Sequence, residues 1–451
     1  MIEVRCFESL DSAAFLRDEI NALNCLAARP DPFSSFEFFE NYVRYDEDSA
    51  SSPSRLWFLT AFERGRLIGY LALKLTRPRT LGIGSPVLGF LVTRDTDRPH
   101  LVASPESQRD VSAAFYTYVL GRKREWSLLE LQQQDESSSL FPPPVGDLEG
   151  YRLREWTSME NCTIHVRWPS LRDYFQALSK KFRSNLARQL RNLLAVGDVE
   201  LLASNDPSVT PALLDLYRSI EPNSWKSRAR ATISRHPTRI AYFHGLLDPR
   251  QPMRISIQIL LLNGAPVAGL INGAFMGGLY ALHIVYDDRL HRFAPGSLIL
   301  LLGMRQAIDG GYAFFNMLSG FGYFKSRWLA HVTETRIAQV YRTGSLLYWR
   351  RTLGDLKRAV FATRASTELA RFNPTRRSVA GGEGEPETSA QVVPALEPSA
   401  AVRTSIAAVL ESVRLGRAQH LSSVDLRAVL QFARPRYDNT GLANGLAHAS
   451  A

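Results

Sequence analysis

Two stretches that lie far apart in the sequence repeat one order of patterns: a helix with an apolar inner face, then two apolar runs separated by a polar turn that contains glycine. In the first stretch, the runs 56–62 and 67–73 flank Glu63-Arg-Gly-Arg66. In the second, the runs 255–262 and 267–274 flank Asn263-Gly264, a pair typical of a type I′ turn. Each set predicts a β-hairpin, and the repeated order indicates a diverged internal duplication.

Other patterns complete each half. The first half has a serine-capped aromatic helix within 30–42, a helix near 107–122 and a strand at 126–131. In the second half, apolar residues three or four apart from Phe175 to Leu193 predict one amphipathic helix, followed later by a strand, a helix and a strand at 279–286, 296–308 and 312–318. The expected fold is α/β (α+β), with mixed sheets flanked by helices, in two domains that span 1–160 and 161–371.

The composition changes past Arg371. Residues 373–400 are rich in Pro, Gly, Glu and Ser, which predicts a flexible linker. Short amphipathic segments at 406–415 and 424–432 predict helices within an otherwise flexible tail, 372–451. We therefore expect that the chain folds without this tail.

Composition also excludes several classes of protein. The chain has 451 residues, of which 45% are hydrophobic and 22% charged, enough to bury a large core. No apolar run is as long as a membrane span or a secretory signal, so a cytoplasmic location is expected. Three scattered cysteines and the absence of a Cys-x-x-Cys pair argue against a disulfide framework and a metal site. A phosphate-binding P-loop, a Gly-x-Ser-x-Gly elbow and a DNA-binding helix-turn-helix signature are also absent.

The formal charge of +10 is concentrated in two places. Six basic residues and one acid lie between Arg172 and Arg191, and residues 222–247 contain five basic residues and no acid. Such surfaces favour anionic ligands such as phosphates or carboxylated sugars, although solvated basic faces without a ligand are equally common.

The segment 279–300 is the most informative for chemistry. A strand ends, a polar loop follows, and Pro295-Gly296 opens an apolar helix. A helix N-terminus presents unpaired N–H groups and the positive end of the helix dipole, so it can bind a pyrophosphate. The alternative is an ordinary connection between a strand and a helix.

The order of short motifs from Asn263 to Trp328 resembles the GNAT-type domain of BioF2-like and cellulose-biosynthesis acetyltransferases. The motifs are, in order, Asn-Gly-x-Pro-Val-Ala, Gly-Gly-x-Tyr, Tyr-Asp, Pro-Gly, Gly-Gly, Phe-Asn-Met-Leu-Ser-Gly, Lys and Trp. These acetyltransferases are relatives of the Fem-type aminoacyl transferases. The resemblance covers roughly 165–345 and implies tandem GNAT-like domains. It also implies a splayed pair of strands that admits the pantetheine arm of CoA.

The resemblance assigns roles to particular residues. The loop Arg292-Phe-Ala-Pro-Gly-Ser297 is similar to the pyrophosphate loop of GNAT enzymes, so the expected donor site consists of Arg292, Pro295, Gly296, Ser297 and Leu298. The expected catalytic residues are Asp287 or His283 as general base, Tyr323 as the acid for the leaving thiolate, and Lys325 on the oxyanion or a donor phosphate. Structural alternatives are a capping Asp, a core histidine, a packed tyrosine and a surface lysine.

The acceptor side is implied by the Trp225-Lys226 pair, which resembles a Trp-Lys segment of the family. Lys181 and Arg188 on the basic helix add positive charge, so a nucleotide sugar or an acidic glycan is an expected acceptor. Basic side chains lying over a packed Trp are the structural alternative.

The resulting hypothesis is a GNAT-type N- or O-acyltransferase that moves an acyl group from acyl-CoA to an amine or hydroxyl of a cell-envelope saccharide. The expected acyl group is acetyl. Its ligands are then a small-molecule donor and acceptor, with no DNA, and it would act in polysaccharide biosynthesis. The alternatives are a Fem-type transferase that uses aminoacyl-tRNA and a catalytically silent GNAT-like binding module in exopolysaccharide production.

Overall fold

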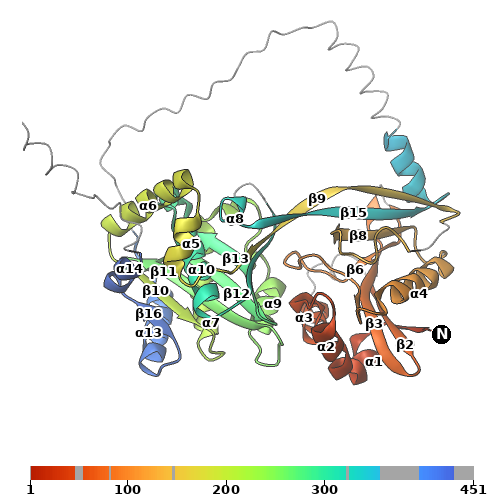
Figure 1. The fold of residues 1–451 in the computed structure, drawn as a ribbon, viewed down its shortest axis with the longest axis horizontal. Helices are drawn as coiled ribbons and strands as arrows, with labels where there is room; N and C mark the ends of the chain where they lie inside the picture. The colour runs from red at the N-terminus through yellow and green to blue at the C-terminus, as the bar shows by residue number, and fades with distance from the viewer. Residues whose placement is uncertain are drawn as a thin grey trace, which may run out of the picture.

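The computed structural model describes residues 2–45, 54–80, 83–144, 148–320, 325–355 and 396–430. Figure 1 shows two bodies side by side, connected along one edge by two long strands. The described strands form one continuous mixed sheet of 14 strands, with a separate two-stranded pair, β4 and β5. The expectation of mixed sheets flanked by helices is confirmed. Among the described residues, no helix is long and apolar enough to cross a membrane.

The N-terminal half contains the elements expected from the sequence. Its strands are β1 (Glu3–Phe7), β2 (Arg55–Glu63), β3 (Arg66–Thr76), β4 (Arg79–Thr80), β5 (Ile83–Gly84), β6 (Val87–Phe90), β7 (Val102–Ala103) and β8 (Leu128–Gln134). Its helices are α1 (Leu10–Ala13), α2 (Arg17–Leu26), α3 (Phe36–Tyr45) and α4 (Gln108–Gly121), with short 3₁₀ turns η1 (Ala14–Leu16) and η2 (Pro32–Ser34). The aromatic face of α3 is buried, as predicted.

The C-terminal half has the same kinds of element in the same order. Its strands are β10 (Val199–Ser204), β11 (Arg254–Leu262), β12 (Ala265–Phe275), β13 (Gly278–Tyr286) and β14 (Phe314–Gly320). Its helices are α5 (Leu171–Ala177), α6 (Lys180–Ala195), α7 (Thr210–Ile220), α8 (Trp225–Arg228), α9 (Pro237–Leu246) and α10 (Pro295–Asp309), with 3₁₀ turns η3 (Glu221–Asn223), η4 (Ile233–Arg235) and η5 (Asp288–Phe293).

One predicted helix is divided in two. The expected single helix from Phe175 to Leu193 is broken between α5 and α6. Leu178 has extended backbone, and the Ser179 side chain accepts a hydrogen bond from the backbone N–H of Phe182, which starts a new helix. The apolar stripe of α6 is still buried, so the periodicity was a correct guide to the packed face.

The two halves share a topology that supports the duplication. In the first half, β1, β2, β3 and β6 pair antiparallel in that order, and β6 then pairs parallel with β8. In the second half, β10 to β13 pair antiparallel, and β13 pairs parallel with β14. Both hairpins have a register shift near the turn. Both turns contain consecutive left-handed residues, Arg64 and Gly65 in the first and Asn263 and Gly264 in the second.

The halves exchange their last strands. Strand β9 (Tyr151–His165) follows β8 in sequence but pairs with β14 of the other half, whereas β15 (His331–Arg342) follows β14 and pairs with β8. β9 and β15 also pair with each other and form the long ribbon in Figure 1. The expected boundary between residues 160 and 161 therefore falls inside β9, and the division of the chain into 1–160 and 161–371 remains a proposal. No local sequence pattern indicates the exchange, because it is a property of pairing between distant segments.

Part of the expected tail is packed and not flexible. Helix α13 (Ala400–Arg414) contacts α7, β16 (Gln419–Leu421) pairs with the edge strand β10, and α14 (Ser423–Val429) lies against the same strand. Val409, Leu426 and Leu430 are buried. Composition misjudged these residues because the side chains of Val409, Leu426 and Leu430 suffice to pack the segment against the C-terminal half, although Leu410, Leu415 and Val424 remain exposed. The expected linker at 373–395 lies outside the described residues.

The two bodies are also packed against each other through α3 and α9. The Asn41 side chain donates a hydrogen bond of 3.0 Å to the carbonyl oxygen of Tyr242, and the Phe38 and Tyr242 rings meet edge to face. Phe33 meets Tyr280 of β13 in the same way. The buried residues of this interface belong to a single apolar cluster with members from both halves, so the halves present a fixed surface to each other.

Candidate functional site

The site is centred on the point where β13 and β14 stop pairing. The two parallel strands are in register only from Gly278 to Tyr280 of β13 and from Phe314 to Asn316 of β14. β13 continues to Tyr286 and β14 to Gly320 without further pairing to each other. A β-bulge at Leu282 of β13 lies just beyond this point. The two strands therefore separate like the arms of a V, and the edge of β13 that faces the gap has no strand partner beyond Tyr280.

The equivalent strands of the N-terminal half are tied together. β6 and β8 also pair over three residues, from Val87 to Gly89 on β6. Beyond that point, the loop that leaves β6 is bonded to the end of β8. The Gln134 side chain donates to the carbonyl oxygen of Pro99 at 2.9 Å, and the backbone N–H of Arg98 donates to the Gln133 side chain at 2.7 Å. The corresponding V of the N-terminal half is thus bridged by protein groups.

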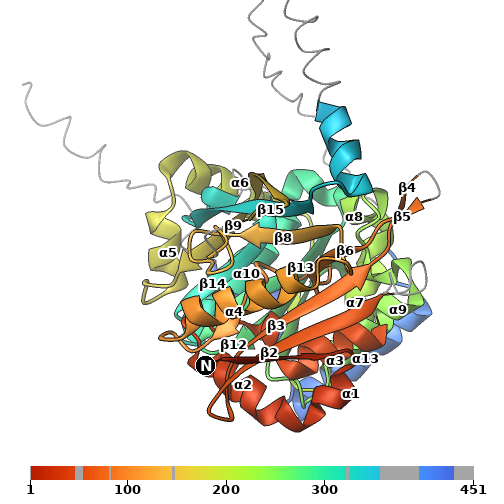
Figure 2. The ribbon, with the colours of Figure 1, turned by 90° about the vertical axis from the view of Figure 1, so that its right-hand side faces the viewer.

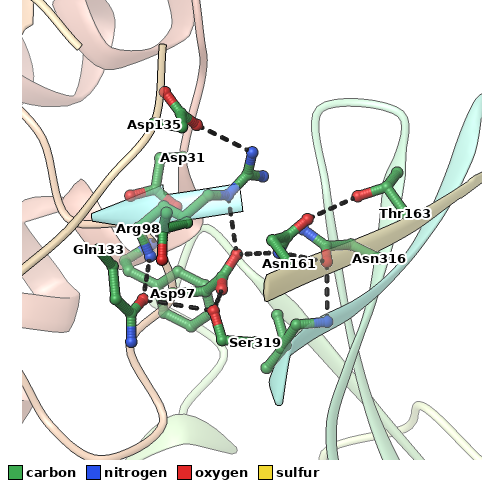
Figure 3. Close-up of polar contacts among 12 residues, drawn as sticks. Asp31, Asp97, Arg98, Gln133, Asp135, Asn161, Thr163, Asn316 and Ser319 are labelled. Carbon is green, nitrogen blue, oxygen red and sulfur yellow. Dashed lines mark hydrogen bonds and ion pairs between the residues drawn. The ribbon is translucent and has the colours of Figure 1, made fainter. Parts of the chain in front are cut away.

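That same N-terminal loop, 93–98, reaches the open V of the C-terminal half (Figure 3). The Asp97 carboxylate accepts hydrogen bonds from Ser319 of β14 at 2.6 Å and from Asn161 of β9 at 2.7 Å. Asn161 also donates to the Asn316 side chain at 3.1 Å. Asp97, Asn161 and Asn316 are all buried. A buried carboxylate held by two side-chain donors fixes the loop at the mouth of the V.

Behind Asp97 lies a network of buried charged groups. Arg98 and Arg29 both contact the Asp135 carboxylate, at 3.2 and 2.8 Å. Burial raises the pKa of Asp31 to about 6, although the nearby positive charge of Arg29 opposes the shift. Burial, with the charge of Arg29, keeps the pKa of His100 well below its usual value. These charged groups belong to the N-terminal half and are connected to the other half through Asp97, which contacts Arg98 and Ser319. They include an acid that titrates near neutrality.

A second buried polar group lies beside the splayed part of β13. Arg239 of α9 forms a 3.1 Å ion pair with Asp95 of the N-terminal loop, and the other oxygen of Asp95 is buried without a hydrogen-bond partner in the described part of the chain. Lys226 of α8 is 7% exposed. Burial lowers the pKa of Lys226 to about 7, against the opposing effect of Asp95. A lysine with this pKa is partly neutral near pH 7 and can accept a proton.

His283 of β13 lies near Lys226, whose charge contributes to lowering the pKa of His283. The larger cause is burial, which holds that pKa well below its usual value. The His283 ring is 2.7 Å from the hydroxyl of Tyr217 and packs beside Phe243. The structure therefore gives His283 the surroundings of a neutral core histidine, which was the structural alternative in the sequence analysis.

The Asp287 carboxylate forms hydrogen bonds that hold the loop, instead of facing an open site. Its carboxylate accepts from the Arg289 guanidinium at 2.6 Å and caps η5 through the backbone N–H of Arg289 at 3.0 Å. Its side chain is 4% exposed. Asp288, one residue later, pairs with Arg228 of α8. These contacts favour capping for Asp287, and they connect the loop after β13 to α8 and thus to the Trp225-Lys226 pair.

Lys325 has a similarly occupied side chain. Its ammonium group donates to three main-chain carbonyl oxygens at the end of β14, those of Met317, Leu318 and Ser319, at 2.6 to 3.0 Å. Leu318 has a left-handed backbone conformation, with φ of 57°. Lys325 thus stabilises the irregular end of the strand and has no donor left for an oxyanion or phosphate in this arrangement. Tyr323 lies outside the described residues.

The start of α10 differs from the expected pyrophosphate cradle. The N–H groups of Ser297 and Leu298 both donate to the carbonyl oxygen of Ala294, at 2.9 and 3.2 Å. Pro295 has no N–H group, so Gly296 supplies the remaining N–H of this turn. A Cβ at Gly296 would lie 2.7 Å from the Tyr286 ring. Packing therefore requires glycine at this position. Gly296→Val is expected to destabilise the fold as well as weaken the binding of any ligand.

The remaining predicted residues lie around this turn. Arg292 of η5 is exposed. Helix α6, with its exposed Lys181 and Arg188, packs against η5. Trp225 is 39% exposed, and the Lys226 ammonium lies 5.7 Å from the centre of its ring. The structure thus brings the basic helix, the loop after β13 and the Trp-Lys pair to one end of β13. The phosphate groups of a donor would meet side-chain charges there in addition to backbone N–H groups.

The residues that sequence reasoning missed are those of the N-terminal half. Asp95, Asp97 and Asn161 belong to a loop and an exchanged strand that carry no motif. One signal was available: if the two halves are repeats, the loop after β6 corresponds to the loop after β13. That correspondence could have directed attention to the acidic segment Thr93-Arg-Asp-Thr-Asp97.

Comparison with known proteins gives one match to a family. Residues 180–326 match the model of the acetyltransferase (GNAT) domain. No curated protein matches the sequence. The matched range begins at α6 and ends just after β14, so it contains the V-shaped separation of β13 and β14 and the loop between β13 and α10.

Solved structures show remote similarity over most of the chain. One is a tandem GNAT protein from the clavulanic acid biosynthesis pathway, with 13% identity, a TM-score of 0.44, and coverage of 76% of this chain and 99% of that one. Another is L-PGS from Bacillus licheniformis, with 13% identity, a TM-score of 0.43, and coverage of 70% and 94%. A third is FemX, with 11% identity, a TM-score of 0.38, and coverage of 71% and 95%.

Proposed function

The chain is a GNAT-type acyltransferase with its acetyltransferase domain at residues 180–326, and from this premise we propose that it transfers an acyl group from acyl-CoA to an amine or hydroxyl at the open V of β13 and β14. The observation that carries the proposal is the end of strand pairing after Tyr280 and Asn316. An extended pantetheine arm can form hydrogen bonds to the unpaired main-chain groups of β13 beyond Tyr280, much as a neighbouring strand would.

The donor's phosphate groups are assigned to the end of β13. Gly296 offers one backbone N–H there, and Arg292, Lys181 and Arg188 offer side-chain charge. The arms of the V fit the pantetheine better than the first turn of α10 fits a pyrophosphate, because the Ser297 and Leu298 N–H groups are already bonded. We therefore assign most of the phosphate binding to arginine and lysine side chains, which bind phosphate oxygens by charge-assisted hydrogen bonds.

The acceptor approaches from the N-terminal half. Asp97 and Asp95 of the loop 93–98 face this side, and Lys226 lies close to β13. In the proposed reaction, the acceptor nitrogen or oxygen forms a bond to the thioester carbon, Lys226 accepts the proton, and the carbon–sulfur bond breaks to release the thiol after it takes up a proton. Holding both substrates at one point supplies much of the rate.

The proposed acceptor class is a cell-envelope saccharide, made in the cytoplasm during polysaccharide biosynthesis. The support is the positive charge around the site, which favours an anionic substrate such as a nucleotide sugar. Lys181 and Arg188 are exposed on α6, and Arg228 joins the loop after β13.

One observation favours a second donor. The incomplete backbone cradle at α10 leaves room for a different anionic donor, and aminoacyl-tRNA also carries an activated ester beside phosphates. A Fem-type aminoacyl transfer is therefore the second candidate. A catalytically silent GNAT pair would need neither donor.

The test is thiol release from acetyl-CoA and longer acyl-CoAs, measured with amino sugars and nucleotide sugars as acceptors. We expect acceptor-dependent thiol release by the native chain. If acyl-CoA gives no turnover but charged tRNA does, the donor assignment is wrong and the Fem-type candidate replaces it. If acyl-CoA binds without turnover for any acceptor class, the silent module is favoured.

A further inference from the structure

An exposed apolar stripe lies on the helical residues 346–355, which follow β15. Leu346, Trp349 and Leu353 are 50%, 55% and 56% exposed, and their spacing of three and four places them on one face of the helix. Figures 1 and 2 both show this segment projecting from the body of the molecule at the end of the β9–β15 ribbon. Clustered apolar side chains on a projecting helix indicate an interaction surface, unlike single exposed residues.

The helix is held in place by the ribbon beneath it. The Ser345 side chain caps its start by accepting from the N–H of Tyr348 at 3.2 Å. Asp355 forms an ion pair with Arg154 of β9. Arg351 lies over the ring of Trp156, a second exposed tryptophan on β9, at 5.9 Å. The stripe is therefore presented in a defined orientation with the ribbon at its side.

The charges around the stripe are mainly positive. Arg350 is exposed directly beside Trp349, and Arg351 and Arg154 lie at the base of the helix. Asp355 is the one acid among these groups, and it is already paired with Arg154 and lies 3.7 Å from Arg351. An apolar face bordered by arginines is complementary, in both apolar area and charge, to a partner with an apolar interior and an anionic outer layer.

We propose that the stripe formed by Leu346, Trp349 and Leu353, with Trp156 beside it, docks the protein on the surface of a membrane that contains anionic lipids. Tryptophan is suited to the lipid interface because its ring is apolar and its N–H is polar. Amphipathic helices with basic edges lie in the plane of the interface, and binding depends on both apolar burial and anionic lipid. The stripe is narrow and edged by charge, which fits a headgroup layer better than the apolar core of a protein interface.

The test uses the full chain and co-sedimentation with vesicles of phosphatidylcholine alone or mixed with phosphatidylglycerol. We expect binding to the mixed vesicles at least about tenfold tighter than to the neutral ones. Leu353→Ser and Trp349→Ser should each reduce binding to the mixed vesicles by about fivefold to tenfold. Trp349→Phe should keep binding but diminish the blue shift of tryptophan fluorescence, which locates Trp349 in the lipid.

Matched controls separate the stripe from general attraction. Leu26→Ser removes an equally exposed leucine, 66% exposed on α2, and should leave binding unchanged. Arg109→Glu on α4 should have less effect than Arg350→Glu. Equal losses from the stripe variants and their controls would overturn the proposal in favour of non-specific binding by a basic protein. Absence of vesicle binding, with self-association that depends on Trp349, would overturn it in favour of a protein partner.

Discussion

The two halves of the molecule have the same strand order, but they differ at the place where their parallel strands separate. In the N-terminal half, Gln133 and Gln134 tie the end of β8 to the loop after β6. In the C-terminal half, the arms of β13 and β14 have no such bridge among the described residues. One half of the duplicated fold thus has its V bridged by its own loop, and we propose that the other half binds substrate at the corresponding place.

The loops after β6 and β13 show how this difference arises. The C-terminal loop is wound into η5 and capped by Asp287, so it stays close to its own helix. The N-terminal loop instead extends to Ser319 and Arg239 of the other half. The N-terminal half therefore contributes the carboxylates of Asp97 and Asp95 to contacts with β14 and α9 of the other half.

The largest effect on turnover should come from substitution of Lys226, the proposed proton acceptor. We propose no residue of the N-terminal half for that role. Lys226→Met preserves volume and should leave the fold intact. Loss of the proton acceptor should reduce kcat by about a hundredfold to a thousandfold. In the native chain, kcat/KM should rise as the pH increases through about 7, because the pKa of Lys226 is lowered to about 7 by burial. This rise should disappear in the variant.

Lys123→Met, at an exposed position of the N-terminal half, is the control and should behave like the native chain. Lys226→Arg should be as inactive as the methionine variant, because arginine does not release its proton. An unchanged pH profile in Lys226→Met would remove Lys226 from the mechanism and leave the two halves without this functional difference.

The tail gives the second contrast, because its described residues, 396–430, pack on α7 and β10 of the C-terminal half. Truncation after Arg371 removes Val409, Leu426 and Leu430 from buried positions and exposes β10 as an edge strand. The free energy of unfolding of the C-terminal half should fall by about 3 kcal/mol after the ordering cost of the tail is subtracted. Hydrogen exchange should show lost protection in β10 and α7 and little change in β2 and β3. Uniform protection in both halves would show that the tail is dispensable.

Asp31 provides a pH-dependent test of the interface contributed by the N-terminal half. Its pKa is raised to about 6 by burial, so its contribution to stability is fully present below its ordinary pKa and is lost as the pH rises through about 6. The expected loss is about 3 kcal/mol. In Asp31→Asn, the difference in Tm between about pH 4 and about pH 7 should shrink accordingly.

Asp206, a partly exposed residue of the C-terminal half, should respond with the opposite sign. Hydrogen bonds from Ser208 lower its pKa, so its contribution is present above its ordinary pKa and is lost as the pH falls. Asp206→Asn should therefore remove the contribution at higher pH, and the fall in Tm towards low pH should become smaller. If Asp31→Asn and Asp206→Asn shifted Tm in the same direction over the same range, Asp31 would not be the buried titrating group.

The smallest effect is expected at the donor phosphates. Arg292→Ala should raise KM for acyl-CoA by about tenfold with kcat nearly unchanged, since one charge-assisted hydrogen bond is lost from binding. The matched variant is Arg109→Ala, in the first turn of the corresponding helix α4, and it should leave KM unchanged. Equal effects would indicate that both halves contribute to donor binding.

Local patterns predicted most of the fold. The hairpins, the aromatic helix α3 and the helix α10 were visible because their signals are turns, caps and apolar periodicity within short segments. The exchange of β9 and β15 was not predictable, because it depends on which of two equivalent edges a strand joins. The packing of the tail was missed because the amphipathic segments at 406–415 and 424–432 do not indicate which surface Val409, Leu426 and Leu430 contact.

The site was predicted less well for a related reason. The sequence located the end of β13, the basic helix and the Trp-Lys pair, all within one half. It could not show that Asp287 binds the Arg289 guanidinium, or that Lys325 donates to main-chain carbonyl oxygens. Both interactions depend on the conformation of the folded loops. Nor could it place Asp95 and Asp97 beside β13 and β14, since that contact joins segments from different halves.

The central claim is that one half is open to the acyl donor and the other is closed. Isothermal titration calorimetry of the native chain with acetyl-CoA, followed by the same titration on Arg292→Ala and Arg109→Ala, tests it directly. The account predicts one binding site per chain, weakened by Arg292→Ala and unaffected by Arg109→Ala. Two sites per chain, or one site that is weakened only by Arg109→Ala, would contradict it.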